Sequence, residues 1–83
     1  MPELIVDGIE LDGWSFQVSL KRYPTAGKQD ALQGGRVYYL EVLKCEDLVC
    51  YYNHKWEVKY DPNDDVTMLC LSIMLQKWNR RIE

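Results

Sequence analysis

The chain has 83 residues, a length that fits one domain, and we treat residues 1–83 as a single unit. Hydrophobic residues make up 47% and charged residues 28% of the sequence, a composition typical of a folded globular protein rather than a disordered segment. The formal net charge of −3 argues against a dedicated nucleic-acid-binding protein, because such proteins usually carry an excess of basic residues.

The cysteines and the ends of the chain indicate a cellular compartment. Cys45, Cys50 and Cys70 are odd in number and have no short paired spacing, so we expect free thiols in a reducing environment. The N-terminal segment carries acidic residues where a signal peptide is basic. The apolar stretch Val66–Leu75 is about half the length of a membrane span. The sequence therefore predicts a soluble, cytoplasmic protein.

A hairpin opens the chain. Asp7-Gly8 and Asp12-Gly13 are both tight-turn signals, because both positions of such a pair tolerate positive φ. The second pair is favoured, since a long alternating run follows it. The apolar residues of that run, expected on the buried face of a strand, are Trp14, Phe16, Val18 and Leu20.

The next segment, Pro24–Gly35, reads as a loop because it has no sustained period and is punctuated by glycines. Within it, residues 30–33 have the composition of one helical turn. Loops of about 12 residues are often functional, and loops held on a rigid sheet often carry recognition residues. We predict that Lys28, Asp30 and Arg36 contribute to partner binding.

Two or three further strands follow. Arg36–Lys44 and Leu48–Tyr52 are rich in β-branched and aromatic residues and form a hairpin across the turn at residues 45–47. Residues 56–60 alternate again. The interruption at residues 53–55 is either a second tight turn or a bulge in one long strand.

A helix is predicted from Pro62 to about Arg81. Asp61 suits the N-cap and Pro62 the first helical position, and Asp64 and Asp65 place negative charge where the helix dipole favours it. The element order predicts an α+β fold: an antiparallel sheet of four or five strands with one C-terminal helix packed on it.

The predicted helix is apolar over nearly twice the width that one sheet face requires. The stripe expected to face the sheet consists of Val66, Leu69, Cys70, Ile73 and Met74. The second stripe consists of Met68, Leu71, Leu75, Trp78 and Ile82. Either the sheet curls around the helix and covers both stripes, or the second stripe meets another chain. For the latter case we predict a two-fold homodimer whose interface contains Met68, Leu71, Leu75 and Trp78.

No catalytic or metal-binding constellation emerges from the sequence. His54 is the sole histidine and has no hydroxyl or thiol close in sequence, although Cys50 could approach it across the bend. The aspartates near Asp61 are explained by helix capping more readily than by a hard cation. We therefore predict no catalytic residues, no metal and no cofactor, and a protein that is not an enzyme; a small hydrolase is a competing class.

Aromatic residues interleave with lysines between residues 37 and 60, as on platforms that bind single-stranded nucleic acid. Acidic residues such as Glu41 and Glu57 break the positive character of that surface. Tyrosine is also common in strands. A single-stranded nucleic-acid-binding module is therefore retained only as the alternative function.

Two stretches, "GGRVYYLEV" and "VCYYNHKWEVKYDP", followed by a terminal helix, resemble a family of short uncharacterised proteins of phages, prophages and mobile elements of Gram-positive bacteria. The positions that match the family outline are Gly34, Gly35, Arg36, Tyr52, Trp56 and Asp61. The bend departs from it, with Asn53-His54-Lys55 where the family has Asp-Arg-Gly.

The resemblance covers roughly residues 12–80 in layout. It implies a phage-type accessory protein and assigns no activity. By analogy, small acidic proteins of this kind often bind and block a host protein, including defence nucleases. We therefore predict a non-catalytic protein-binding accessory protein that acts in the cytoplasm of a bacterial host, with inhibition of a defence system such as CRISPR as one such role.

Overall fold

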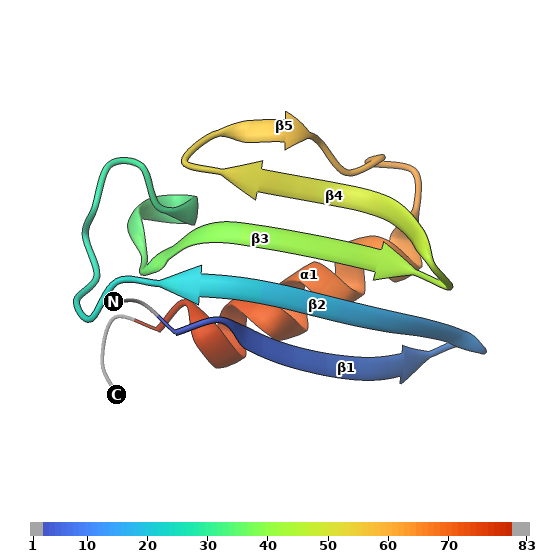
Figure 1. The fold of residues 1–83 in the computed structure, drawn as a ribbon. Coiled ribbons are helices and arrows are strands. Elements are labelled where there is room, and N and C mark those ends of the chain that lie inside the picture. The colour runs from blue at the N-terminus through green and yellow to red at the C-terminus, as the bar shows by residue number, and fades with distance from the viewer. Residues whose placement is uncertain (1–2, 81–83) are drawn as a thin grey trace.

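The structure is a computed structural model that describes residues 3–80. Its elements are β1 (Ile5–Leu11), β2 (Trp14–Arg22), a short 3-10 helix η1 (Leu32–Gly34), β3 (Val37–Lys44), β4 (Asp47–Asn53), β5 (Trp56–Val58) and α1 (Asp65–Trp78). The strands form one antiparallel sheet in the order β1-β2-β3-β4-β5, and α1 crosses one face of it (Figure 1). The predicted α+β architecture is confirmed.

The first hairpin turns at Asp12-Gly13, as predicted. Both residues have positive φ, 53° and 80°, which is the backbone geometry that a two-residue hairpin requires. Leu11 is paired with Trp14 across the turn, and the register continues without a shift to Ile5 opposite Leu20. The turn chemistry thus sets the pairing of the whole β1–β2 ladder.

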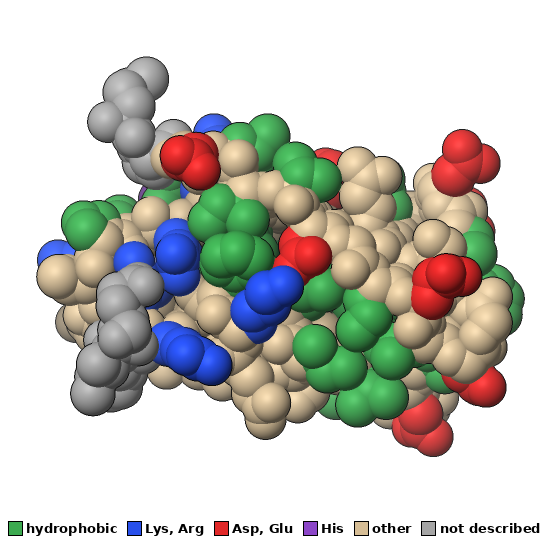
Figure 2. Space-filling model, turned by 90° about the horizontal axis from the view of Figure 1, so that it is seen from below, with side chains coloured by type: hydrophobic (Ala, Val, Ile, Leu, Met, Phe, Trp, Pro, Cys, Tyr) green, Lys and Arg blue, Asp and Glu red, His purple; other side chains and the backbone are tan. Residues whose placement is uncertain are grey.

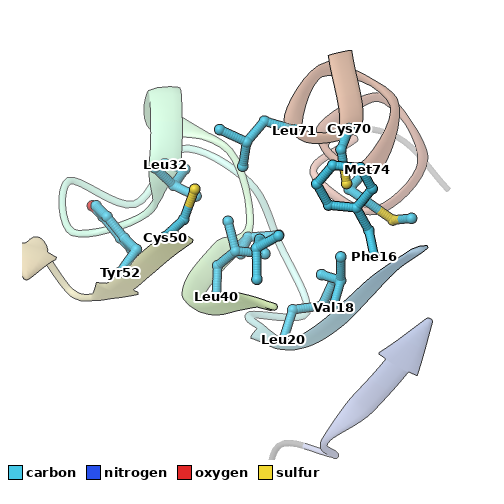
Figure 3. Close-up of a cluster of buried hydrophobic side chains, with 12 residues drawn as sticks. Phe16, Val18, Leu20, Leu32, Leu40, Cys50, Tyr52, Cys70, Leu71 and Met74 are labelled. Carbon is cyan, nitrogen blue, oxygen red and sulfur yellow. The ribbon is translucent and has the colours of Figure 1, made fainter. Parts of the chain in front are cut away.

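The core lies between the sheet and α1. Alternate residues of β2 and β3 point towards the helix, and the other face of the sheet carries no covering element among residues 3–80 (Figure 1). Figure 3 shows side chains from β2, β3, β4, η1 and α1 meeting in this layer. The cluster consists of Phe16, Val18, Leu20, Leu32, Val37, Leu40, Val42, Cys50, Tyr52, Cys70, Leu71 and Met74.

The interruption at residues 53–55 is a tight turn between two strands. His54 has a φ of 62°, and the N–H of Asn53 donates to the carbonyl of Lys55 at 2.8 Å. The following strand, β5, spans only Trp56–Val58, so Tyr60 lies beyond the sheet. The predicted extent of this strand, residues 56–60, was therefore too long.

The helix begins at Asp65, not at Pro62. Asp64 is the N-cap: its Oδ1 accepts a hydrogen bond from the N–H of Thr67 at 3.2 Å, while Oδ2 accepts from the Thr67 hydroxyl at 2.7 Å. The predicted cap Asp61 instead accepts from the N–H of Asn63, within the preceding turn. The predicted start is therefore wrong. Both aspartates are possible N-caps, and Asp64 is the one used because its side chain bonds to Thr67.

The rotation of α1 about its axis also differs from the prediction. Leu69, expected to face the sheet, is 50% exposed, whereas Leu71, expected to face away, is only 5% exposed. The buried side chains of the helix are Thr67, Cys70, Leu71 and Met74. Arg81 and Ile82, which were also assigned to the helix region, lie outside the described residues. Within residues 3–80, no helix has both the length and the apolar character that crossing a membrane requires.

Candidate functional site

An open groove of about 640 Å³ lies on the helix side of the sheet, between α1, β4–β5 and η1. It exists because α1 packs over β1–β3, leaving the β4–β5 edge beyond the helix. In Figure 3, Leu71 projects from α1 towards Leu32 and Tyr52, which stand across a gap from the helix. Three segments that are distant in sequence therefore form the walls of one concave surface.

The wall at the sheet edge is aromatic. Tyr52 and Trp56 are paired across β4 and β5, and their rings meet edge-to-face with centroids 5.2 Å apart. The rings of Trp56 and Tyr60 are also edge-to-face, with centroids 5.4 Å apart. Such edge-to-face pairs stabilise each other beyond simple burial. Trp56 and Tyr60 stay half-buried in this chain, so part of each ring is available to a ligand.

The opposite wall is one side of α1. Met68, Leu71 and Leu75 repeat at three and four residues and line the groove, with Ser72 and Gln76 exposed beside them. The flexible thioether of Met68 and the half-buried side chain of Leu75 can adapt to the shape of an incoming apolar group. The polar rim is completed at η1 by the exposed side chain of Gln33. The arrangement provides an apolar interior with hydrogen-bonding groups at the edge.

The four residues predicted to form a dimer interface do not share one exposed surface. Met68 and Leu75 face the groove, while Leu71 closes its floor and is buried in its own chain. Leu71 therefore cannot contribute an exposed contact, and its expected orientation was wrong. Dimerisation through Met68 and Leu75 stays a prediction.

Trp78 has a structural role at the far end of α1. Its indole Nε1–H donates to Asp7 Oδ2 at 3.0 Å, and the guanidinium of Arg22 lies over its ring at 5.1 Å. Lys77 Nζ donates to the same Asp7 oxygen at 2.9 Å, which is the main reason that the pKa of Asp7 lies below its ordinary value. These contacts fasten the helix end to β1 and β2.

Arg36, predicted to bind a partner, is only 6% exposed. Its Nε–H donates to the carbonyl of Tyr23 at 2.9 Å, and Tyr23 N–H donates to the Arg36 carbonyl at 2.8 Å. Arg36 therefore fastens the two ends of the long loop together. The expectation that it presents its side chain to a partner was wrong, because its burial leaves little of it accessible.

Asp30, the second of these residues, belongs to a hydrogen-bonded network within the chain. Its Oδ2 accepts a hydrogen bond from the Tyr23 hydroxyl at 2.6 Å and lies 2.5 Å from Nδ1 of His54. The bond from Tyr23, followed by that from His54, lowers the pKa of Asp30, and the same bond raises the pKa of Tyr23 to about 12. Lys28 is exposed nearby. Partner binding by Lys28 and Asp30 stays a prediction.

Sequence reasoning missed this network. The ring of Tyr38 stacks on that of His54 at 5.0 Å and lies 4.4 Å from that of Tyr23, so an aromatic stack joins the loop to the β4–β5 turn. A histidine in a turn and an aspartate in a loop were both visible, but nothing in their spacing paired them. The network explains how the loop that carries η1 is held against the groove.

The uncovered face of the sheet offers a smaller aromatic surface. Tyr39 and Tyr51 lie edge-to-face with centroids 5.9 Å apart, and Lys21 Nζ lies 5.4 Å from the centre of the Tyr39 ring. Glu41 is directly opposite Tyr51 in the ladder and so shares this face. The Glu41 carboxylate therefore places negative charge beside the two tyrosines.

Comparisons of this chain with protein-family models, with curated proteins and with solved structures found no match.

Proposed function

We propose that this chain is a non-catalytic binding protein that takes an apolar segment of a partner protein into the groove between α1, β5 and η1. The observation that carries the proposal is the partly exposed apolar lining of Trp56, Tyr60, Met68 and Leu75 in one concave surface. Aromatic residues and methionine are enriched in the centres of protein interfaces, and polar groups in their rims.

The chemistry of the lining favours a protein segment over a reacting substrate. The side chains that line the groove are aromatic, aliphatic, thioether, amide and hydroxyl groups, and none is a histidine, carboxylate, thiol or amine. These last are the groups that most often serve in general acid–base catalysis. An apolar side chain of a partner would instead gain about 1.5–3 kcal/mol by burial among these walls.

The resemblance to phage and prophage accessory proteins decides which partner to test first. A protein of the bacterial host cytoplasm is the first choice, and a defence nuclease, as in CRISPR systems, is the first class within it. Inhibition would follow from occupying a surface that the host protein needs, which requires no chemistry from this chain.

Affinity capture from a bacterial lysate tests the proposal when it is done with a matched pair of variants. Ser72→Arg places a long side chain at the groove wall from an exposed position, and Gln17→Arg places the same charge at an exposed position on the uncovered sheet face. We expect that wild type and Gln17→Arg will both capture the same host protein from the lysate and that Ser72→Arg will not. Equal retention by both variants would contradict the groove as the binding site.

A second candidate function, single-stranded nucleic-acid binding, rests on the Tyr39–Tyr51 pair and Lys21 on the uncovered face. Stacking of one base on an aromatic ring contributes about 1–3 kcal/mol. Fluorescence anisotropy with a labelled oligothymidylate would detect it. Binding that Tyr51→Ala abolishes and Ser72→Arg leaves intact would favour this candidate over the groove.

A further inference from the structure

Among residues 3–80, β1 is an edge of the sheet, and it is long and regular. Within that part of the chain it pairs with β2 alone, and its seven residues follow one register without a bulge, whereas β5 at the opposite edge has three residues. Natural proteins blunt edge strands with charged side chains, lysine above all, with inward-pointing charges, or with proline, bulges or short length. β1 contains neither lysine nor proline, and of its two charges Glu10 is exposed while the inward-facing Asp7 is paired with Lys77 of α1. An edge of this kind is able to accept another strand.

The hairpin turn determines which backbone groups of β1 point outwards. In a two-residue hairpin the pair flanking the turn, here Leu11 and Trp14, is hydrogen-bonded, and hydrogen-bonded pairs then alternate along the ladder. The N–H and C=O groups of Val6, Gly8 and Glu10 therefore face away from β2. The Gly8 N–H agrees with this, since it donates to the side-chain Oδ1 of Asp7 at 2.8 Å, a local bond that an added strand would replace.

An apolar strip of α1 lies beside this edge. Val66, Leu69 and Ile73 share one side of the helix with Lys77, whose contact with Asp7 places that side next to β1. Leu69 is half-exposed, and Val66 and Ile73 are partly buried. Figure 2 looks onto this edge and shows hydrophobic side chains gathered across it. A strand added at β1 would bring its own helix against the same strip.

The two ends of the molecule carry opposite charge. Acidic residues outnumber basic ones at the end where β1 finishes: Asp12, Glu46, Asp47, Asp61 and Asp65 lie there with Lys44 and Lys59. Basic residues outnumber acidic ones at the other end: Arg22, Lys28, Lys55 and Arg80 lie there with Glu3 and Asp30. In Figure 2 Lys and Arg lie towards one end of this face and most Asp and Glu towards the other.

We propose that a second copy of this chain pairs with β1 in antiparallel fashion about a two-fold axis, joining two five-stranded sheets into one. An antiparallel pairing of identical strands sets the acidic end of each copy beside the basic end of the other, whereas a parallel pairing would set like charges together. The contact lies on the opposite side of α1 from the groove, so it is independent of the proposed function and leaves the groove open.

Sedimentation equilibrium with circular dichroism tests this dimer. Val6→Pro removes an outward N–H from an edge strand, a position where proline is tolerated, and Leu69→Glu charges the exposed strip. Both variants should keep their secondary structure and weaken the dimer at least about tenfold, the equivalent of losing one buried leucine. Val58→Lys at the opposite edge is the control and should dimerise as wild type does.

Salt dependence tests the orientation. In the antiparallel dimer the acidic and basic ends attract each other, and salt screens that attraction, so the dimer should weaken as the salt concentration rises. A wild type that is monomeric at millimolar concentration would overturn the proposal. So would a dimer that persists in both Val6→Pro and Leu69→Glu but is lost in Ser72→Arg, since that result would place the contact at the groove. A dimer that does not weaken as salt rises would overturn the antiparallel arrangement.

Discussion

The side chain of Asn79 lies directly against Gly35, so closely that a Cβ atom on residue 35 would come within 2.4 Å of the Asn79 amide. That amide accepts hydrogen bonds from the N–H groups of Arg36 at 2.7 Å and Val37 at 2.8 Å. It also donates to the carbonyl of Leu32 at 2.8 Å. One residue after α1 thus fastens the helix end to η1 and to the start of β3, and only glycine leaves room for it.

Gly35→Ala and Asn79→Ala should therefore each destabilise the fold, yet not additively. The first introduces a clash of about 1–3 kcal/mol, and the second leaves backbone N–H groups without a partner, at a similar cost. Asn79→Ala also removes the atoms that clash. Urea denaturation of the two variants and the double variant should show the double falling short of additivity by about 1 kcal/mol or more. Strict additivity would mean that the two residues do not touch.

The rotation of α1 is tested by a matched pair of leucines. Leu71→Ala should cost about 2–5 kcal/mol of unfolding free energy, because it opens a cavity in the core. Leu69→Ala should stay within about 0.5 kcal/mol when it is measured at a concentration where the chain is monomeric. Thermal or chemical denaturation measures the unfolding free energy of the two variants against that of wild type. A larger loss at Leu69 than at Leu71 would restore the orientation that the sequence predicted.

The N-cap at Asp64 makes stability depend on acid pH. Hydrogen bonds from Thr67, and then from Lys44 at 3.0 Å, lower its pKa from 3.8 to about 2. Because the folded-state pKa is depressed, this stabilisation is fully present above about pH 4 and is lost as pH falls through 2. Asp64→Asn should flatten that part of the stability–pH curve relative to wild type, and Asp64→Ala should cost about 1 kcal/mol near neutral pH. Parallel wild-type and Asp64→Asn curves would contradict the assignment.

The three cysteines are free thiols, as predicted, but they should differ in reactivity. Burial raises the pKa of Cys50 to about 12 and that of Cys70 to about 11, whereas Cys45 is exposed in a turn. The thiolate is the reactive form, so a thiol reagent at pH 8 should modify Cys45 quickly and the buried pair only on unfolding. Rapid native-state modification of all three would show that the core opens more readily than the packing implies.

Local sequence signals predicted the strands and their order well. Asp12-Gly13 can adopt the positive φ values of a hairpin turn, and the alternation of Phe16, Val18 and Leu20 can be satisfied by one buried face only. These features depend on residues within a few positions of one another, so a single sequence is enough to define them. Trp14, expected on the same buried face, is 43% exposed beside the turn, so that part of the prediction was wrong.

The rotation of α1 about its axis was predicted less well, because apolar residues cover most of the circumference of the helix. Thr67 is 1% exposed, yet it carries a hydroxyl and would not be counted as a core residue from hydrophobicity. Its burial is permitted by the hydrogen bond to Asp64, which only the correct N-cap provides. Because Thr67 was not counted as a core residue, the predicted inner stripe was centred towards Leu69, although two of its residues, Cys70 and Met74, are buried as expected.

The groove and the Asp30–His54 network could not be predicted, because both join segments that are distant along the chain. Nothing near Trp56 indicates that Met68 will face it, and nothing near Asp30 indicates His54. The glycine pair Gly34-Gly35 was visible in the sequence, and the structure gives each residue a local reason: Gly34 has a φ of 66° and Gly35 accommodates Asn79.

Methyl NMR of methionine measures occupation of the groove most directly. Met68 lines the groove, while Met74 is 2% exposed in the core and serves as an internal reference in the same spectrum. On titration with the protein captured from the lysate, we expect the Met68 methyl signal to shift or broaden progressively while the Met74 signal changes little. A complex that forms with the Met68 signal unchanged would contradict binding through the groove.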